Sequence, residues 1–211
     1  MKITVIGASR GIGRKVVEYA LERGHTVRAV ARSAEAIETE SAALEKVQGD
    51  ATDPELLAHA VAGADAVILT LGVPRDVRAL KPTTLFSTAT QALIPAMEVA
   101  GVKRLLTVTG FGAGDSYGKL SAPEKLTLKT FLGRAYADKD LQEDLIRGSG
   151  LDWTIARPGI LTDTKMTGKY QVLVDPSTWR QGIISRADVA HFLVHAAEEG
   201  SHVHQTPALQ R

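Results

Sequence analysis

A glycine-rich loop near the N-terminus carries the clearest chemistry in this sequence. Residues 7–13 read Gly-Ala-Ser-Arg-Gly-Ile-Gly and lie between an expected strand and an expected helix. Gly7 permits a sharp turn, Gly11 lets the backbone approach a pyrophosphate, and Gly13 allows close packing of the helix on the sheet. The N-terminus of that helix presents unpaired N–H groups to the phosphates. We therefore predict a dinucleotide site rather than a structural turn, with contacts from Gly7, Ser9, Arg10, Gly11, Ile12 and Gly13.

The end of the second expected strand favours a cofactor with a phosphorylated ribose. A carboxylate about 20 residues after the glycine loop usually binds the adenosine ribose of NAD. Here the strand ends Ala31-Arg32-Ser33, so Arg32 stands where that acid would be, and Arg10 lies within the loop. Two guanidinium groups and a hydroxyl suit a 2′-phosphate. We predict NADP(H), the alternative being that both arginines are solvated surface residues.

Two further strand ends are expected to contact the adenosine half of the cofactor. Asp50 and Ala51 follow the third expected strand, and Asp50 is placed to accept a hydrogen bond from the adenine amino group. Leu71 and Gly72 end the fourth, where small residues leave room for the ribose and phosphates. Asp53 precedes a proline and is better explained as a helix N-cap.

The elements that must position these residues alternate between strand and helix. Continuous apolar strands separated by amphipathic helices are typical of a parallel sheet covered on both faces. The fold class predicted is therefore α/β, a Rossmann-like doubly wound sheet forming one domain over residues 1–211. About 50 residues follow the sixth strand, and part of them (about 160–182) is expected to form a small C-terminal lid on the substrate side. The expected strands are 3–6, 26–31, 44–48, 66–71, 104–108, 153–157 and a short one at 170–174, and the main helices are 11–23, 34–39, 54–61, 84–100, 122–131, 134–149 and 186–198.

The composition narrows the class of protein. The 211 residues include 25 Lys and Arg against 24 Asp and Glu, a net charge of +1 that gives no electrostatic basis for binding nucleic acid or an anionic membrane. Cysteine is absent, which excludes disulfides and thiolate metal sites. We expect a cytoplasmic protein, monomeric or homodimeric, because neither a secretory signal nor an apolar run long enough to span a membrane is visible.

Several motifs together resemble the atypical short-chain dehydrogenase/reductases. They are the glycine loop, Gly49-Asp50, Leu71-Gly72, residues 149–154, Arg157-Pro158-Gly159 and residues 184–190. The length and the segment 161–174 are similar to the biliverdin-IXβ reductase/flavin reductase branch and to NmrA-like NAD(P)H-binding proteins. The resemblance implies a doubly wound sheet, NADP binding and reduction of flavins, quinones or related planar acceptors. It also implies that Pro158, Gly159 and Ile160 lie beside the nicotinamide, the alternative being a simple turn.

The catalytic pattern departs from that of the typical members, which use a Tyr-x-x-x-Lys helix and a serine or threonine after the fifth strand. Tyr136 here precedes Lys139 by three residues instead of four, and Gly110 stands where a hydroxyl is expected. We therefore predict catalysis by proximity, in which Thr109 and Lys139 position the cofactor and acceptor. Tyr136 is a weaker candidate for a proton donor, with a packed or surface tyrosine as the alternative.

Three aromatic residues are candidates for stacking on the planar acceptor. Phe111, Tyr117 and Trp179 fall in loops that follow the C-terminal ends of strands, where ligands bind in such sheets. The alternative is that they pack the lid against the sheet.

A metal site is not expected, although four histidines lie near the C-terminus. His191 and His195 fit the edge of an amphipathic helix, and nothing in the sequence completes a ligand set for them or for His202 and His204. The function predicted is an NADPH-dependent reductase of a planar acceptor. The main alternative is an NmrA-like regulatory protein that senses NADP(H) without turnover, and a third is a redox-neutral epimerase or assembly factor.

Overall fold

A central sheet of eight strands organises the chain in the computed structural model, which describes residues 1–73 and 83–211. Its strand order is β3-β2-β1-β4-β5-β6-β10-β8, and β8 is antiparallel to β10 while the other neighbours are parallel. A two-stranded sheet pairs β7 with β9. The strands are β1 (Lys2–Ile6), β2 (Thr26–Ala31), β3 (Leu44–Gln48), β4 (Ala66–Leu69), β5 (Arg104–Val108), β6 (Asp152–Pro158), β7 (Ile160–Thr162), β8 (Gln171–Leu173), β9 (Ile183–Ser185) and β10 (Ala208–Gln210).

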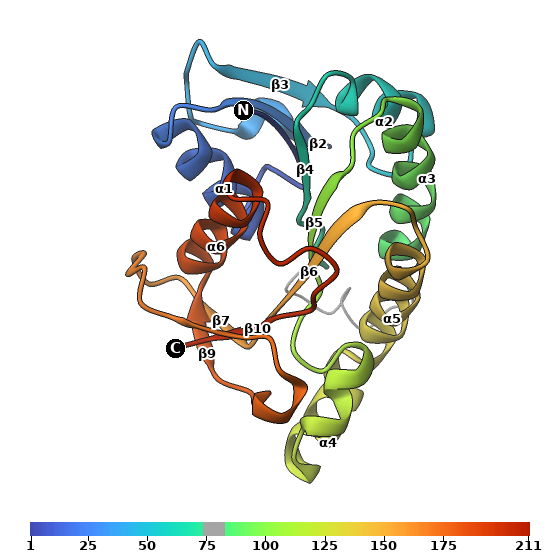
Figure 1. The fold of residues 1–211 in the computed structure, drawn as a ribbon, viewed down its shortest axis with the longest axis vertical. Helices are drawn as coiled ribbons and strands as arrows, with labels where there is room; N and C mark the ends of the chain where they lie inside the picture. The colour runs from blue at the N-terminus through green and yellow to red at the C-terminus, as the bar shows by residue number, and fades with distance from the viewer. Residues whose placement is uncertain (74–82) are drawn as a thin grey trace.

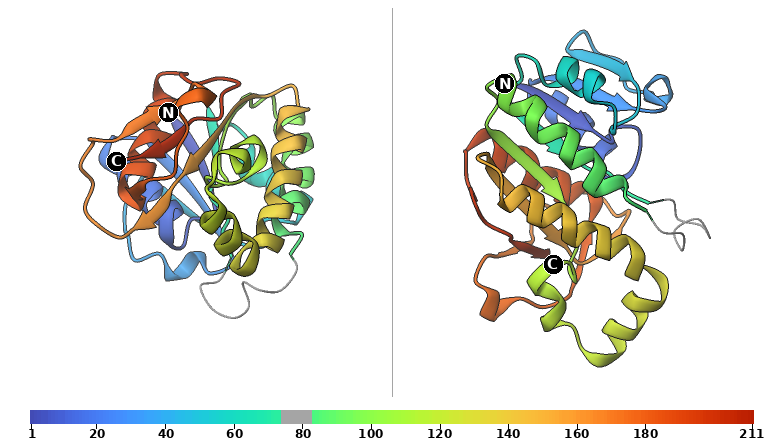
Figure 2. Two further views of the ribbon diagram at one scale, coloured as in Figure 1. Left: turned by 90° about the horizontal axis from the view of Figure 1, so that it is seen from below. Right: turned by 90° about the vertical axis from the view of Figure 1, so that its right-hand side faces the viewer.

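Helices cover both faces of this sheet (Figure 1), as the doubly wound prediction requires. Helices α1 and α6 pack together on one face, and α2, α3 and α5 cover the other, where α3 and α5 lie side by side (Figure 2). Every residue of β4 is buried, because a strand covered on both faces must be apolar throughout. The helices are α1 (Gly11–Glu22), α2 (Pro54–Val61), α3 (Leu85–Val99), α4 (Ala122–Phe131), α5 (Gly133–Arg147) and α6 (Arg186–Glu198).

Local signals in the sequence set most of these boundaries. Asp53 caps α2, since its Oδ1 accepts a hydrogen bond from the N–H of Glu55 at 2.9 Å. Ser121 and Glu124 form the capping box that begins α4. The expected helix over residues 34–39 is wrong in extent, because that segment forms only one turn of 3₁₀-helix, Ala34–Ala36.

The region after β6 holds more regular structure than the sequence indicated. Three strands of three residues each (β7, β9 and β10) were not expected, because three residues are too few to show a period of two. A 3₁₀-helix, η3 (Gly114–Lys119), follows β5, and a second one, η4 (Pro176–Thr178), follows β8.

The segment 160–182, here called the lid segment, is tied to α6. The Asp188 carboxylate accepts hydrogen bonds from the N–H groups of Thr167 at 2.7 Å and Gly168 at 2.9 Å. The Tyr170 hydroxyl lies 2.8 Å from His191 Nδ1. His195 Nε2 lies 3.0 Å from the Tyr19 hydroxyl. Both histidines of α6 therefore contact tyrosines of neighbouring segments.

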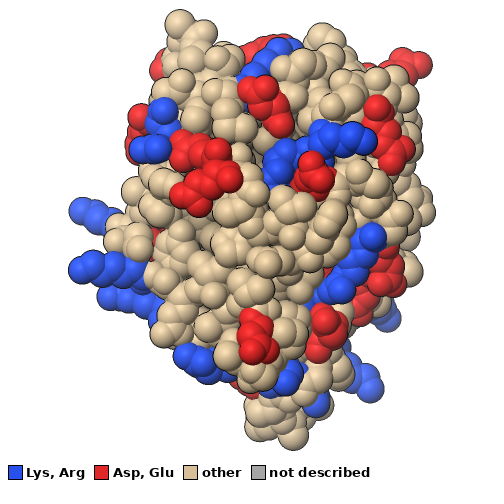
Figure 3. Space-filling model, viewed as in Figure 1, with Lys and Arg blue, Asp and Glu red and all other residues tan. Residues whose placement is uncertain are grey.

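The surface carries charges of both signs. On the face shown in Figure 3, Lys and Arg are interspersed with Asp and Glu. Within the described ranges, no helix is both long enough and apolar enough to cross a membrane. The same residues contain no group of three or more His, Asp or Glu side chains arranged to hold a metal ion.

Candidate active site

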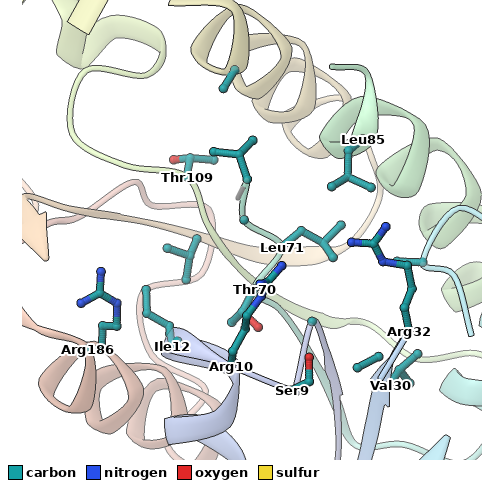
Figure 4. Close-up of a pocket in the computed structure, with 18 of the residues that line it drawn as sticks. Ser9, Arg10, Ile12, Val30, Arg32, Thr70, Leu71, Leu85, Thr109 and Arg186 are labelled. Atoms are coloured by element: carbon teal, nitrogen blue, oxygen red, sulfur yellow. The ribbon is translucent and has the colours of Figure 1, made fainter. Parts of the chain in front are cut away.

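One cavity of about 780 Å³ opens at the carboxyl ends of β1, β2, β4 and β5. Helix α5 and the beginning of the lid segment complete its wall. Figure 4 shows that its polar side chains come from the glycine loop, the end of β2, the end of β5 and the start of α6. Most of the expected site residues line it: Gly7, Ser9, Arg10, Gly11, Ile12, Arg32, Asp50, Ala51, Leu71, Gly72, Thr109, Tyr136 and Lys139.

The glycine loop brings α1 against the sheet as closely as the chain allows. Gly7 has φ +89° and its N–H donates to the carbonyl of Val30 at 2.9 Å, which turns the chain out of β1. A Cβ at Gly13 would stand 2.2 Å from the carbonyl oxygen of Gly7 and 2.5 Å from Thr70 Oγ1. Gly13 does not line the cavity. Its place in the structure is the contact between helix and sheet that the motif predicted.

The first turn of α1 is open to a phosphate group. Arg10 occupies the N-cap position, no side chain caps the helix, and no acidic residue lies in the first turn. The N–H groups of that turn therefore keep their hydrogen-bonding capacity and the partial positive charge of the helix end. Gly11, at φ +60°, has open space where a Cβ would be. These features fit a bound pyrophosphate.

Arg32 and Asp50, the residues expected to contact the adenosine, line the cavity. Both side chains are exposed at the rim. Asp50 Oδ1 accepts hydrogen bonds from the Thr52 N–H at 2.9 Å and the Thr52 hydroxyl at 2.8 Å. These bonds, and to a smaller extent the charge of Arg32, hold the pKa of Asp50 below its ordinary value. Asp50 is thus a fixed carboxylate, able to accept from an adenine amino group.

At the other end of the cavity, Lys139 and Thr109 form a fixed pair. Lys139 Nζ donates to the carbonyl oxygen of Thr109 at 2.7 Å and to that of Val108 at 3.3 Å. It also lies 4.5 Å from the centre of the Phe86 ring. Burial lowers the pKa of Lys139 to about 8, although nearby carboxylates oppose the shift. The lysine therefore holds the backbone at the end of β5 in place.

A buried ion pair that the sequence did not reveal orients Thr109. The Thr109 hydroxyl donates to Glu143 Oε1 at 2.7 Å, and the same oxygen accepts from Arg157 Nε at 3.0 Å. Glu143 and Arg157 are 1% and 0% exposed. Because the Thr109 hydrogen is committed to Glu143, its hydroxyl oxygen presents lone pairs to the cavity. It can accept a hydrogen bond from an amide such as that of a nicotinamide.

Tyr136 lines the cavity, and no side chain of residues 1–73 and 83–211 hydrogen-bonds its hydroxyl. Its hydroxyl lies 3.4 Å from the carbonyl oxygen of Phe111, and burial raises its pKa to about 12, with the charges of Asp140 and Glu143 acting in the same direction. A Cβ at Gly110 would stand 2.5 Å from the Tyr136 hydroxyl oxygen. The glycine at this position, which is unlike typical members, therefore makes room for the tyrosine.

The three aromatic candidates for acceptor stacking lie outside the cavity lining. Phe111 and Trp179 are buried in an apolar cluster with Leu120 and Ala208, and the Trp179 ring lies 5.0 Å from the Arg157 guanidinium. The structure thus gives these two residues the packing role that was the alternative. Tyr117 is 41% exposed on η3.

After β6, the residues that line the cavity lie a few positions later in the chain than the expected ones. Leu161 and Asp163 line it, whereas Pro158, Gly159 and Ile160 do not. A nicotinamide contact from those three residues stays a prediction. Arg186 also lines the cavity and was missed as a site residue. Residues 184–190 were recognised as a family motif, but the helix that Arg186 begins lies more than 100 residues after Gly72, and the motif does not place its side chain in the cavity.

Comparison with known proteins relates the whole chain to nucleotide-binding relatives. A family model described as NAD(P)H-binding matches residues 7–200. The "uncharacterized sugar epimerase YhfK" of Bacillus subtilis (strain 168) is 30% identical over 206 residues, which cover 94% of this chain and 89% of that protein. The NAD(P)H azoreductase of Xenophilus azovorans is 30% identical over 159 residues, 74% of this chain and 47% of its own.

A solved structure shares the fold over the full length. It is ChuY, an anaerobilin reductase from Escherichia coli O157:H7, with 29% identity and a TM-score of 0.82. The match covers 100% of this chain and 97% of that one. The fold of this chain is therefore one that is also found in a reductase.

Proposed function

The chain belongs to the NAD(P)H-binding family and has the fold of the atypical short-chain dehydrogenase/reductases, and from this premise we propose that it is an NADPH-dependent reductase of a planar acceptor such as a flavin or quinone. One observation carries the proposal. A single cavity joins an uncapped helix end and two exposed guanidinium groups to an apolar region held in place by Thr109 and Lys139. The names of two relatives, an azoreductase and an anaerobilin reductase, support an acceptor with conjugated planar groups.

The bound cofactor would supply a hydride, and the chain's own residues would supply geometry. Thr109 and Lys139 would hold the nicotinamide end, while Val108, Leu132 and Ala135 line the cavity and exclude water from the acceptor. Holding two reactants in register removes much of the entropic part of a barrier. A flavin or quinone can take its proton from water, so no acidic side chain is required.

The first prediction concerns the choice of cofactor. Replacing Arg10 and Arg32 with alanine is expected to weaken NADPH binding about 10- to 100-fold, the size of a lost set of charged hydrogen bonds. NADH binding should change little, since NADH lacks the 2′-phosphate. Isothermal titration calorimetry with both cofactors measures the two dissociation constants.

Arg14→Ala serves as the matched control for this prediction. Arg14 lies on the same helix but forms an ion pair with Glu18 at 2.9 Å outside the cavity lining. Its removal should leave both dissociation constants unchanged. An unaltered ratio of NADPH to NADH affinity in the Arg10 and Arg32 variants would reject the assigned phosphate site.

The second prediction concerns Tyr136. Because burial raises the pKa of its phenol to about 12, the group stays protonated throughout the working range and is a poor acid. Tyr136→Phe is expected to keep kcat within about tenfold of the parent, and the pH profile of kcat between about 6 and 10 should keep its shape. A loss of kcat above about 100-fold, roughly 2.7 kcal/mol, would assign proton donation to this residue.

Turnover separates the proposed reductase from a sensor of NADP(H). Steady-state oxidation of NADPH is measured with a panel of flavins, quinones and azo compounds. A reductase consumes NADPH in the presence of at least one acceptor. A protein that binds oxidised and reduced cofactor equally well, and reduces no acceptor of the panel, is a regulatory protein. Purification with a tightly bound nicotinamide cofactor would instead favour a redox-neutral activity such as epimerisation.

A further inference from the structure

A cationic side chain at the acceptor end of the cavity has no role in the function proposed above. Arg186 is the first residue of α6 and lines the cavity, with its side chain 12% exposed. Figure 4 places it on the same side as Ile12 and across the cavity from Arg32. Arg10 and Arg32, which we propose bind the 2′-phosphate, are thus complemented by a third guanidinium on the opposite side of the cavity from Arg32.

Within the described part of the chain, Arg186 makes one hydrogen bond. Its Nη1 donates to Asp163 Oδ1 at 2.8 Å. A guanidinium carries five N–H donors in a planar fork, so its Nε and Nη2 groups remain available to a ligand in the cavity. None of the Arg186 nitrogens is both buried and without a hydrogen-bond partner, as expected for groups that face an accessible cavity.

The ion pair with Asp163 does not by itself explain why a charged side chain is held in this largely buried position. The Asp163 side chain is 73% exposed, and ion pairs of that kind contribute about 0–1 kcal/mol to stability. Arg186, by contrast, is largely withdrawn from water, which is unfavourable for a charge. The arrangement does show what the guanidinium recognises, because a carboxylate already approaches it from the solvent side.

The wall around Arg186 suits a flat apolar body. Ile12 lies on the same side of the cavity as Arg186 (Figure 4), and Leu161, Leu132 and Ala135 also line the cavity. Lys139, the other cation at this end, is occupied by the carbonyl groups of Val108 and Thr109. Within residues 1–73 and 83–211, Arg186 is therefore a guanidinium with donors available to a ligand that has a conjugated ring and an acidic group.

We infer that Arg186 is a specificity residue that binds a carboxylate of the acceptor, and that the preferred substrates are planar conjugated molecules bearing a carboxylate. The inference rests on the proposed function for the presence of an acceptor in this cavity. Arg186 would hold the acid through Nε and Nη2, while Asp163 fixes the orientation of the guanidinium through Nη1.

A matched pair of dyes tests this inference by binding and by turnover. The NADP⁺-saturated protein is titrated at pH 7.5 with 4-dimethylaminoazobenzene-2′-carboxylate and with its methyl ester, and binding is followed by the change in dye absorbance. The wild-type protein is expected to bind the acid at least about tenfold more tightly than the ester, as expected for a charge-assisted hydrogen bond. Arg186→Gln should bring the ratio close to one by weakening only the acid.

Arg180→Gln is the control for loss of charge. Arg180 is an exposed arginine of the lid segment that donates to Gln171 Oε1 at 2.9 Å outside the cavity lining, so its variant should keep the wild-type ratio. Calorimetry with NADPH should give the same dissociation constant for all three proteins. This shows that the Arg186 variant is folded and that the arginine does not serve the cofactor.

The possible results distinguish failure of the carboxylate site from failure of the proposed reductase activity. A wild-type protein without preference for the acid, or an Arg186 variant that keeps the preference, overturns the carboxylate site. A protein that binds the acid through Arg186 but never reduces either dye with NADPH supports the site and rejects the proposed reductase. A weakened NADPH affinity in the Arg186 variant overturns the inference by assigning the arginine to the cofactor.

Discussion

Replacing Glu143 with alanine is expected to lower the free energy of unfolding by about 3–5 kcal/mol, because removal of the buried partner leaves a buried charge with only an exposed carboxylate beside it. The charge is that of Arg157, which is 0% exposed and donates to Glu143 through Nε at 3.0 Å. The same change frees the Thr109 hydroxyl, which donates to Glu143 at 2.7 Å. Urea unfolding followed by tryptophan fluorescence measures the loss.

Asp115→Asn provides the matched control, since Asp115 contacts the same guanidinium from the surface. Its side chain is 56% exposed, and its Oδ1 lies 2.5 Å from Arg157 Nη1. A surface partner of this kind contributes about 0–1 kcal/mol. If the Glu143 and Asp115 variants lose equal stability, the buried pair does not have the role assigned to it.

A double variant separates the interaction from the residues that make it. When Glu143→Leu is combined with Arg157→Met, no unpaired charge remains, and a buried ion pair replaced by apolar groups is often neutral in stability. The double variant should therefore be more stable than Glu143→Ala alone. Its NADPH affinity should nevertheless fall, because Thr109 loses the acceptor that orients its hydroxyl.

The sequence predicted the parts of this protein that depend on local chemistry. The glycine loop and the cap at Asp53 are signals of a few residues each, and the strands at the centre of the sheet are rich in apolar residues. The strands β1 to β6 therefore agree with the expected ranges to within about two residues. Residues that follow those strands were placed in the cavity by the general rule for parallel sheets.

The parts that were missed depend on contacts between distant segments. Glu143 and Arg157 are charged residues on a helix and a strand, and hydrophobic periodicity predicts that charged residues face solvent. Their burial becomes visible only when the two elements pack together. Arg186 likewise reaches the cavity because α6 packs on α1, and the family motif at residues 184–190 does not reveal that packing. The aromatic residues Phe111 and Trp179 were equally ambiguous, since packing and ligand stacking use the same side chains.

Replacing Gly13 with alanine is expected to destabilise the fold by about 3 kcal/mol or more, the upper range for a forced contact in a packed interior. The new Cβ would lie 2.2 Å from the carbonyl oxygen of Gly7, so α1 must move away from the sheet. Gly13 has no positive φ, and the entire effect therefore comes from the contact and not from backbone strain. NADPH affinity should fall at least about tenfold, because the N–H groups at the helix end move with it.

Thermal unfolding with and without NADPH distinguishes these two effects. A ligand at 100 times its dissociation constant stabilises a protein by about 2.7 kcal/mol, so the rise in Tm on adding NADPH reports affinity. Gly133→Ala is the control, because its Cβ would meet no atom closer than 3.9 Å and an alanine there stabilises or leaves the helix unchanged. A Gly13 variant that keeps the wild-type rise in Tm would show that the position of α1 does not determine cofactor binding. In that case the arginines, and not the helix end, would have to provide most of the affinity for the phosphates.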